Sequence, residues 1–445
     1  MSSLRVSALL LLAFAVTINC LPRYLETPEN GNLWAVLIAG SDTWDNYRHQ
    51  ADICHAYQIL KKHGIPDDRI IVFMKDDIAN NEANPTPGII INHPKGSDVY
   101  KGVPKDYTGL AVTPKTFMAV LKGDKKAVSN YGSGKVLQSG PNDHVFVYFA
   151  DHGAPGLIAF PEGELSAKDL NKTINYMHEK NMYGKMVIYI EACESGSMFE
   201  GILPQNINVY ATTAANATQP STACYYDEKR ETFLGDSYSV HWMEDSDKEV
   251  LTKETLQQQY EITKNETTES SVQQYGDLSI AQLRVSEFQG RKDSEGIVLP
   301  KVENDSIRSR DASIEILRRK YLKSNSEEEQ SKLKRKLQKM LDNRLFMHQR
   351  VSEIVADIFH DHNEEKDVLE NRYRLTSFDC YDTIRAHFNG ECFRLSKVHY
   401  FSSEIFAYFK FCLEPSQRVI NRTVSAYPGR SGYWIIGSND STYLI

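Results

Sequence analysis

The sequence predicts an α/β domain of three layers, in which helices cover both faces of a mostly parallel sheet, followed by an all-helical C-terminal domain. Two observations predict the first domain. Apolar runs of strand length recur between residues 33 and 213, and segments with helical spacing lie between them. A third observation predicts the helical domain, because large apolar residues recur at helical spacing after residue 326.

The first part of the α/β domain is predicted to form a strand, a helix and a second strand. Leu33 to Gly40 and Arg69 to Met74 have the length and composition of strands, and Tyr47 to Lys62 between them predicts a helix. Two further runs, His144 to Ala150 and Met186 to Ile190, are almost wholly apolar, as expected of strands covered on both faces. These four strands form the centre of the predicted sheet.

The rest of this domain contains a helix, a fifth strand and a long loop region. Ser166 to Glu179 predicts a helix, and Ile207 to Thr213 predicts the fifth strand. Asp76 to Thr113 is rich in Asn, Pro and Gly and predicts loops over the strand ends.

Four segments are predicted along the chain. Residues 1–20 form a secretory signal peptide, because Arg5 precedes an apolar stretch that is too short to span a bilayer. Residues 21–290 form the α/β domain, and residues 291–325 form a polar linker that is open to cleavage. Residues 326–445 form the helical domain, which begins at a capping box. No later stretch is long and apolar enough for a membrane helix, so no membrane span is expected.

The formal charge of −8 is distributed unevenly along the chain. The first 290 residues contain 25 Lys and Arg against 36 Asp and Glu, whereas the remaining residues contain 26 against 23. The helical domain is therefore expected to be attracted to the α/β domain. Phosphate would be repelled by an acidic domain, so no nucleic-acid partner is expected.

Chemically active side chains follow two of the predicted strands. Glu191 and Cys193 end one strand, and His152 follows another within Asp151-His152-Gly153. Ligands of open α/β sheets bind beyond the carboxyl ends of the strands, where a Cys can act as a nucleophile and a His as its base. This is the pattern of a cysteine hydrolase. Cys193 taken alone is equally compatible with an ordinary buried thiol.

The two motifs that carry these side chains resemble a known family. Tyr148 to Gly153 and Glu191 to Gly196 closely resemble the corresponding segments of legumains, the asparaginyl endopeptidases also called vacuolar processing enzymes in plants. The resemblance implies a caspase-like fold for the α/β domain. It also implies that the helical domain is a prodomain that covers the active site until acidification.

The resemblance assigns the catalytic roles. Cys193 is the nucleophile and His152 the acid and base, because a thiolate attacks the peptide carbonyl and the departing amine needs a proton. The backbone N–H groups of Gly153 and Cys193 are implied as the oxyanion donors. Asn46 is implied to orient His152, although Asn at this position could equally cap the following helix.

The resemblance also defines a pocket for the asparagine side chain, which presents one carbonyl acceptor and one amide donor. Arg48 is implied to donate to the carbonyl, and Glu191 and Asp236 to accept from the amide, with His49 and Ser221 alongside. An aspartate side chain would be repelled by the two carboxylates, so cleavage after Asp is expected only at acid pH. A structural ion pair between Glu191 and Arg48 is an alternative that is compatible with this pocket.

Several modifications are also expected. Asn325 lies where the family's prodomain is usually released, and the resemblance pairs Cys380 with Cys412, which leaves Cys392 without its usual partner. Asp76-Asp77 and His360-Asp361-His362 do not form a convincing ligand set, so no metal and no cofactor is expected. Six N-glycosylation sequons fit a secretory route: Asn171, Asn216, Asn265, Asn304, Asn421 and Asn439.

The sequence therefore predicts a cysteine endopeptidase zymogen that cuts after Asn, releases its own prodomain in acid, and resides in a lysosome or acidic vacuole or is secreted. Its expected partners are proteins and peptides with Asn at the cleaved position, its own prodomain and cystatin-type inhibitors. A peptide ligase is an alternative, because an amine can resolve the same thioester. A non-catalytic secreted binding protein is a second alternative, which the intact set of Asn46, His152 and Cys193 disfavours.

Overall fold

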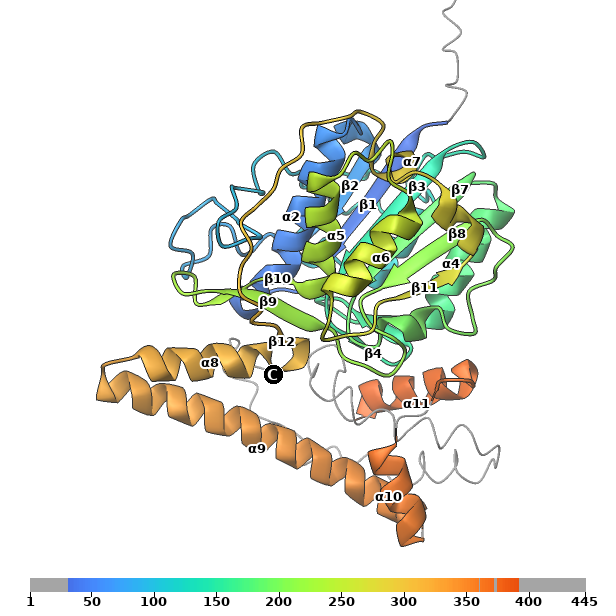
Figure 1. Ribbon diagram of the computed structural model, residues 1–445. Coiled ribbons are helices and arrows are strands. Elements are labelled where there is room, and N and C mark those ends of the chain that lie inside the picture. Colours follow the sequence, from blue (N-terminus) through green and yellow to red (C-terminus); the bar gives the residue numbers. More distant parts are fainter. Residues whose placement is uncertain (1–30, 360, 372–373, 392–445) are drawn as a thin grey trace, which may run out of the picture. The chain divides into compact units, whose positions relative to one another are not determined.

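A six-stranded sheet forms the centre of the structure (Figure 1). The computed structural model describes residues 31–359, 361–371 and 374–391, and the described residues from Leu33 onwards belong to one compact unit. The order across the sheet is β11-β8-β7-β3-β1-β2. The bounds are β1 (Leu33–Ala39), β2 (Ile70–Phe73), β3 (His144–Ala150), β7 (Lys185–Glu191), β8 (Val209–Thr213) and β11 (Gln273–Gly276).

The sheet is parallel except for its edge strand β11, which pairs antiparallel with β8. The chain passes from β1 to β2 on one side, and then returns to place β3 and β7 on the other side of β1. The order of the strands therefore reverses between β1 and β3. In open α/β sheets the crevice at such a reversal, outside the carboxyl ends of the strands, is the usual ligand site.

Helices cover both faces of this sheet, which gives the three predicted layers. Alternate residues of β1 belong to two separate cores: Leu33, Ala35 and Leu37 pack in one, and Trp34 and Val36 in the other. Side chains point to opposite faces along a strand, so each face has its own helices. One face is covered by α2 (Tyr47–Lys62), α5 (Ser237–Lys248), α6 (Leu256–Glu266) and α7 (Ser286–Gln289), and the other by α3 (Pro114–Leu121) and α4 (Ala167–Glu179).

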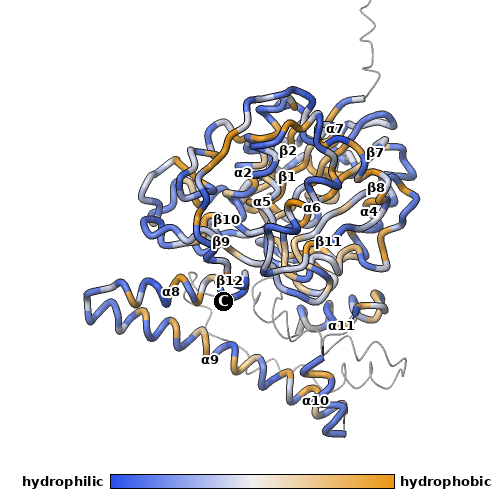
Figure 2. The backbone as a smooth tube through the Cα atoms, in the orientation of Figure 1, coloured by the Kyte–Doolittle hydropathy of each residue, from blue (hydrophilic) through white to orange (hydrophobic). Residues whose placement is uncertain are grey.

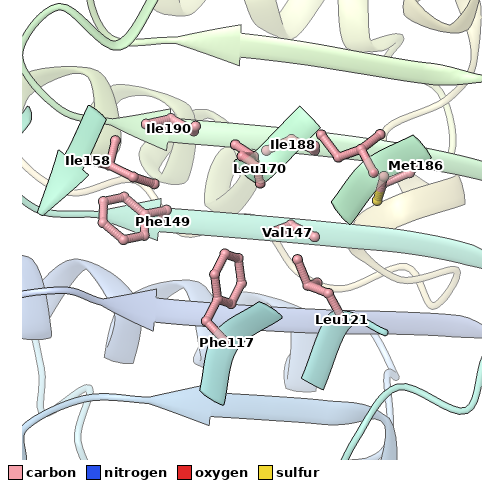
Figure 3. A pocket seen from close by; sticks show the side chains of 10 residues that line it. Phe117, Leu121, Val147, Phe149, Ile158, Leu170, Met186, Ile188 and Ile190 are labelled. Atoms are coloured by element: carbon pink, nitrogen blue, oxygen red, sulfur yellow. The ribbon is translucent and has the colours of Figure 1, made fainter. Parts of the chain in front are cut away.

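The packing under α3 and α4 leaves a small cavity against the sheet (Figure 3). Phe117 of α3, Leu170 of α4 and Ile188 of β7 are among the side chains that line it, and all ten lining residues are apolar. An apolar void offers no hydrogen-bond partner to a polar ligand, and such voids stay dry in proteins. We therefore assign it to the core. Figure 2 shows the same core as hydrophobic colouring along the central strands.

Two small sheets flank the central one near the carboxyl ends of its strands. One consists of β4 (Gly153–Ala154), β5 (Leu157–Ala159) and β6 (Glu164–Ser166), all antiparallel. The other consists of β10 (Thr232–Asp236), β9 (Thr222–Asp227) and β12 (Ile307–Arg308). Because β12 lies in the predicted linker, a segment beyond the α/β domain completes this second sheet.

The described part of the C-terminal region is helical, as predicted. Its elements are α8 (Ala312–Lys323), α9 (Glu327–Ile358), α10 (His362–Glu370) and α11 (Phe378–Glu391). The Ser326 hydroxyl accepts from the backbone N–H of Glu329 at 3.3 Å and so caps α9. Helix α8 lies inside the predicted linker and was not predicted, because only Ala312 and Ile316 of its twelve residues are buried.

The predicted elements of the α/β domain agree closely with the structure. The helix predicted over Tyr47 to Lys62 is α2, and the predicted strands differ from β1, β2, β3, β7 and β8 by at most two residues at an end. From Asp76 to Thr113 the chain forms loops, with one short 3-10 helix, η3 (Gly109–Ala111). Within the described ranges, no helix is long and apolar enough to cross a membrane. The predicted signal peptide lies outside those ranges.

Candidate active site

The candidate site lies where β3 and β7 end. These two strands are paired in register, with Ala150 beside Glu191 at their carboxyl ends. The segments that carry His152 and Cys193 therefore leave the sheet next to each other. The strand order reverses between β1 and β3, so His152 follows a strand at the reversal and Cys193 follows the neighbouring strand β7. The parallel pairing thus brings together two motifs that are some forty residues apart in the sequence.

Cys193 follows β7 in a sharp turn. Its neighbour Glu194 has a left-handed backbone with a φ of 49°, and the 3-10 helix η4 (Ser195–Met198) starts directly after it. The Cys193 side chain is buried, and its Sγ lies 3.8 Å from the hydroxyl of Ser221. A Cβ added to Gly153 would lie 2.2 Å from the carbonyl oxygen of Cys193, so only glycine fits there. The structure therefore brings Gly153, Cys193 and Ser221 together.

Asn46 contacts His152 in the structure. Its amide nitrogen donates to the carbonyl oxygen of Asp42 at 3.0 Å, so its Oδ1 faces His152 Nε2 at 2.9 Å. His152 Nε2 must then carry the hydrogen, so Nδ1 is the ring nitrogen that can accept a proton. Asn46 also precedes α2, but its side chain makes no capping hydrogen bond there. Its side chain thus contacts the imidazole of His152 and does not cap the helix.

A second imidazole, that of His49, lies against His152 with the ring centroids 5.0 Å apart and nearly perpendicular. Its Nδ1 lies 2.6 Å from the Ser41 hydroxyl and 3.3 Å from Asp151 Oδ1. The donor atoms of His49, Asp151 and His152 lie within 4.8 Å of one another, which is close enough for a metal ion. Because the rings already bond to Ser41 and Asn46, we assign this cluster to orienting the two imidazoles.

Arg48 is completely buried beside this cluster. Its Nε donates to Asp236 Oδ1 at 2.9 Å, and its Nη1 donates to the Asp45 carbonyl oxygen at 3.2 Å. Asp236 Oδ2 also lies 3.4 Å from His49 Nε2. Burial raises the pKa of Asp236, and the Arg48 guanidinium acts in the opposite direction. Arg48 thus pairs with Asp236. The ion pair between Arg48 and Glu191, which the sequence left open as an alternative, is not the one in the structure.

Glu191 lies at the end of β7 and is also buried. Its Oε2 accepts from the backbone N–H and the hydroxyl of Ser239, at 3.1 and 3.0 Å. Its Oε1 is buried as well, and the Ser221 side chain also hydrogen-bonds to Glu191. Burial and the nearby Asp236 raise the pKa of Glu191 well above its usual value. Glu191 thus adds a second buried carboxyl group beside Arg48 and Asp236.

All three cysteines that the structure describes as free are buried: Cys54, Cys193 and Cys224. Burial raises the pKa of Cys193 to about 11 and that of Cys54 to about 12, and it raises the pKa of Cys224 well above its usual value. The Arg310 guanidinium lowers the pKa of Cys193 but does not outweigh burial. Cys193 is thus a thiol in this state, and only this cysteine follows a central strand at the site.

The predicted linker enters the pocket. Strand β12 pairs antiparallel with β9, and the backbone N–H of Ser309 donates to the Ser221 carbonyl oxygen at 2.9 Å. Arg48 Nη2 donates to the Ser309 hydroxyl at 2.8 Å. Arg310, the next residue, forms a buried ion pair with Glu194. An extended segment of the chain thus occupies the position in which a peptide would add a strand to β9.

The fold and the site together define a cysteine peptidase. A thiol and an amide-oriented imidazole lie at adjacent strand ends, next to a buried polar pocket that holds an extended peptide segment. The comparisons then identify the family. The model of the Peptidase C13 family matches residues 33–291, and the chain belongs to this family.

Curated relatives support the same assignment. The chain is 55% identical to legumain of Rattus norvegicus over 380 residues, covering 84% of this chain and 87% of the relative. It is 44% identical to the vacuolar-processing enzyme delta-isozyme of Arabidopsis thaliana, covering 84% and 85%. The chain is therefore a legumain-type cysteine endopeptidase, and the alternative of a non-catalytic binding protein is set aside.

Among solved structures, a caspase-1 from Spodoptera frugiperda matches with a TM-score of 0.35 and 10% identity, covering 61% of this chain and 94% of that one. This score is too low to support a further conclusion about the site.

The other predicted site residues lie outside this pocket. Asn325 is exposed between α8 and α9. Cys380 is disulfide-bonded, and its expected partner Cys412 lies outside the described residues. The sequons at Asn265 and Asn304 are exposed, those at Asn171 and Asn216 are half-buried, and those at Asn421 and Asn439 lie outside the described ranges.

Five residues near the site were missed by the sequence analysis: Ser41, Asp52, Glu194, Ser309 and Arg310. Asp52 follows Arg48 by one helical turn, so the i, i+4 spacing could have indicated it. Ser309 and Arg310 lie in a polar linker where no local pattern distinguishes them from their neighbours.

Proposed function

We propose that the chain is the precursor of an endopeptidase that cuts after asparagine, with Cys193 as its nucleophile. The observation that carries this proposal is the polarity of the buried pocket. Arg48 Nη2 is a cationic donor, and the buried side chains of Glu191 and Asp236 carry carboxyl oxygens that can accept. An asparagine side chain needs one donor for its carbonyl oxygen and acceptors for its amide, which this pocket supplies.

Catalysis would proceed through a thioester. His152 takes the proton of the Cys193 thiol, and Sγ attacks the backbone carbonyl carbon of the asparagine residue, forming a tetrahedral oxyanion. The backbone N–H groups of Gly153 and Cys193 would stabilise the oxyanion. His152 then donates a proton to the departing amine as the C–N bond breaks. Water attacks the thioester, its proton passes to His152, and the thiol is regenerated.

The described state supports a latent precursor. Ser309 takes up the Arg48 hydrogen bond that a substrate carbonyl would need, and β12 covers the edge of β9. The burial that raises the pKa of Cys193 keeps it protonated. The linker thus acts as an intramolecular inhibitor, and cleavage after Asn325 would release the helical domain. Protonation of carboxylates in acid would weaken the ion pairs between these parts.

The proposed location is the secretory pathway, ending in an acidic compartment such as a lysosome or vacuole, or outside the cell. Legumains and vacuolar-processing enzymes are the relatives that this chain matches. Two exposed sequons and a disulfide-bonded cysteine fit this route.

The experiment is a panel of peptides that differ only in the residue before the scissile bond. Acid-treated protein is incubated with the Asn, Gln, Asp and Lys versions, and the products are identified by mass. We expect cleavage after Asn to exceed cleavage after Gln and Lys by at least a hundredfold, and cleavage after Asp to appear only as the pH falls. Similar rates for Asn, Gln and Lys would refute the proposed specificity.

A further inference from the structure

A second buried carboxyl group lies behind the pocket. Asp52 is on α2, one turn after Arg48, and it is fully buried. Its Oδ1 accepts from Asn92 Nδ2 at 2.7 Å. A Cβ added to Gly235 would lie 3.3 Å from this oxygen, so the glycine before Asp236 leaves room for the approach. None of the pocket roles described above accounts for Asp52.

The two carboxyl groups of Asp52 and Asp236 cannot both be ionised at low cost. If both were carboxylates, Asp52 Oδ2 would be a buried acceptor without a hydrogen-bond donor in the described structure, whereas Asp236 has Arg48 and Ser309 as donors and its Oδ2 lies 3.4 Å from His49 Nε2. A proton shared between them supplies that donor, and a hydrogen bond links the two side chains. Arg48 pairs with Asp236, so the proton belongs on Asp52.

The charges around Asp52 agree with this placement of the proton. Burial raises the pKa of Asp52 well above its usual value, and the negative charges of Asp236 and Glu191 raise it further. Only the hydrogen bond from Asn92 acts in the opposite direction among the main contributions. The hydrogen bond from Asp52 in turn lowers the pKa of Asp236.

The other side of Asp52 is held by a chain of hydrogen bonds that reaches Asp247. Asn92 Nδ2 donates both to Asp52 and to the Leu234 carbonyl oxygen, at 2.7 and 2.8 Å. Its Oδ1 must therefore accept from His55 Nδ1, which lies 2.8 Å away. His55 Nε2 faces the carboxylate of Asp247 at 2.8 Å, so both ring nitrogens donate and His55 is an imidazolium.

This chain sets the orientation of Asn92. Although burial opposes protonation of His55, the hydrogen bond and the charge of Asp247 raise its pKa. A cationic His55 cannot accept a hydrogen bond, so the Asn92 side chain cannot flip to point its amide nitrogen at His55. Asn92 thus always presents a donor to Asp52 Oδ1, which leaves Oδ2 as the oxygen that carries the proton.

We propose that Asp52 is a specificity-determining positioning residue, a neutral carboxylic acid that donates its proton to Asp236 and so keeps Asp236 an acceptor toward the pocket. The inference rests on the proposed cleavage after asparagine. Asp52 acts through Asp236 and does not touch the substrate. Asp52 thereby makes the pocket select the amide nitrogen of an asparagine side chain, because an ionised Asp236 can only accept hydrogen bonds.

The test compares Asp52→Asn with Asp52→Ala. Asparagine keeps a donor for Asp236 and an acceptor for Asn92 without a charge, whereas alanine removes both. We expect Asp52→Asn to retain kcat/KM for the Asn peptide within threefold of the unmodified enzyme. Asp52→Ala should lose at least tenfold, mainly through KM. Asp68→Asn, an exposed change beyond the other end of α2, is the matched control and should have no effect.

The pH profile of the ratio of cleavage after Asn to cleavage after Asp gives the decisive readout. If Asp52 is neutral, this profile is the same in Asp52→Asn and in the unmodified enzyme. If Asp52 were ionised, removing its charge would increase cleavage after Asp at the upper end of the pH range, and the inference would be overturned. The same holds if Asp52→Asn folds but loses as much activity as Asp52→Ala. Failure of the unmodified enzyme to cut after Asn would instead refute the proposed function.

Discussion

Arg310 of the linker and Glu194, the residue after the proposed nucleophile, form an ion pair in which the Glu194 side chain is fully buried. The Arg310 side chain is only 9% exposed. Its backbone lies next to Ser309, which takes a hydrogen bond from Arg48. The ion pair therefore holds the linker next to Cys193, while the neighbouring Ser309 holds it next to Arg48.

Arg310→Ala should weaken the hold of the linker on the active site. Removing one partner of a buried ion pair costs on the order of 3 kcal/mol. We expect the variant precursor to show peptide cleavage at a higher pH than the unmodified precursor. The activity of each precursor is measured after equal incubations between pH 4 and 7. Arg308→Ala, an exposed change two residues away, is the control. Identical activation profiles for all three proteins would contradict a fastening role.

Arg48→Ala should lower the preference for Asn before it affects the fold. The change leaves Asp236 without its cation, and a lost hydrogen bond to a charged group costs about 2 kcal/mol, or roughly thirtyfold in affinity. We expect the ratio of kcat/KM for Asn over Gln peptides to fall by this factor. Arg69→Ala, at the start of β2 and the opposite end of the sheet, is the control. An unchanged ratio in Arg48→Ala would exclude this pocket.

Glu254→Gln should raise the stability of the protein at neutral pH but not in acid. Burial, with the nearby Asp245, raises the pKa of Glu254 to about 9, whereas a glutamate in an unfolded chain titrates near pH ~4.3. Between these values the folded protein holds a proton that the unfolded chain releases, so stability falls as the pH rises. Gln cannot ionise and avoids this loss.

The expected gain for Glu254→Gln is roughly 1–2 kcal/mol at pH ~7 after allowance for solvent screening, and close to none at pH ~4. Thermal unfolding of both proteins at the two pH values measures it. Glu261→Gln, an exposed change on α6, should show no such dependence. A gain of equal size at both pH values would show that the effect is not one of protonation.

Self-cleavage should occur after Asn325. This residue is exposed in the short connection between α8 and α9, and the proposed enzyme prefers Asn. Purified precursor held in acid should yield a new amino terminus at Ser326, found by terminal sequencing of the released fragment. The Cys193→Ala precursor alone should not yield it. A Ser326 terminus of equal abundance in that sample would show that another protease makes the cut.

The centre of the fold was predictable because burial of a parallel strand leaves a continuous apolar run. That is why β1, β3 and β7 were located, and why Cys193 and His152 could be placed at strand ends. The helix α2 was predicted over its full length from its apolar spacing. Family resemblance, and not the pattern itself, supplied Asn46 and the pocket residues.

The remaining features depend on pairing between distant residues. Ser309 and Arg48 are hydrogen-bonded although they are 261 residues apart in the sequence, and no local sequence pattern predicts such a contact. The strand β12 was missed because two residues are too short for a pattern, and β9 was missed because its pairing with β10 and β12 becomes visible only in the folded chain. Asp52 was missed because its role depends on Asn92 and Asp236, which come from other parts of the chain.

The central claim is that Cys193 attacks the carbonyl of an asparagine held in this pocket. The most direct measurement is covalent labelling of acid-treated protein with a peptide aldehyde or chloromethyl ketone that ends in Asn, followed by mass mapping of the adduct. A single adduct is expected on Cys193, with none from the Gln version of the probe and none in Cys193→Ala. Labelling of Cys54 or Cys224, or equal labelling by the Asn and Gln probes, would contradict it.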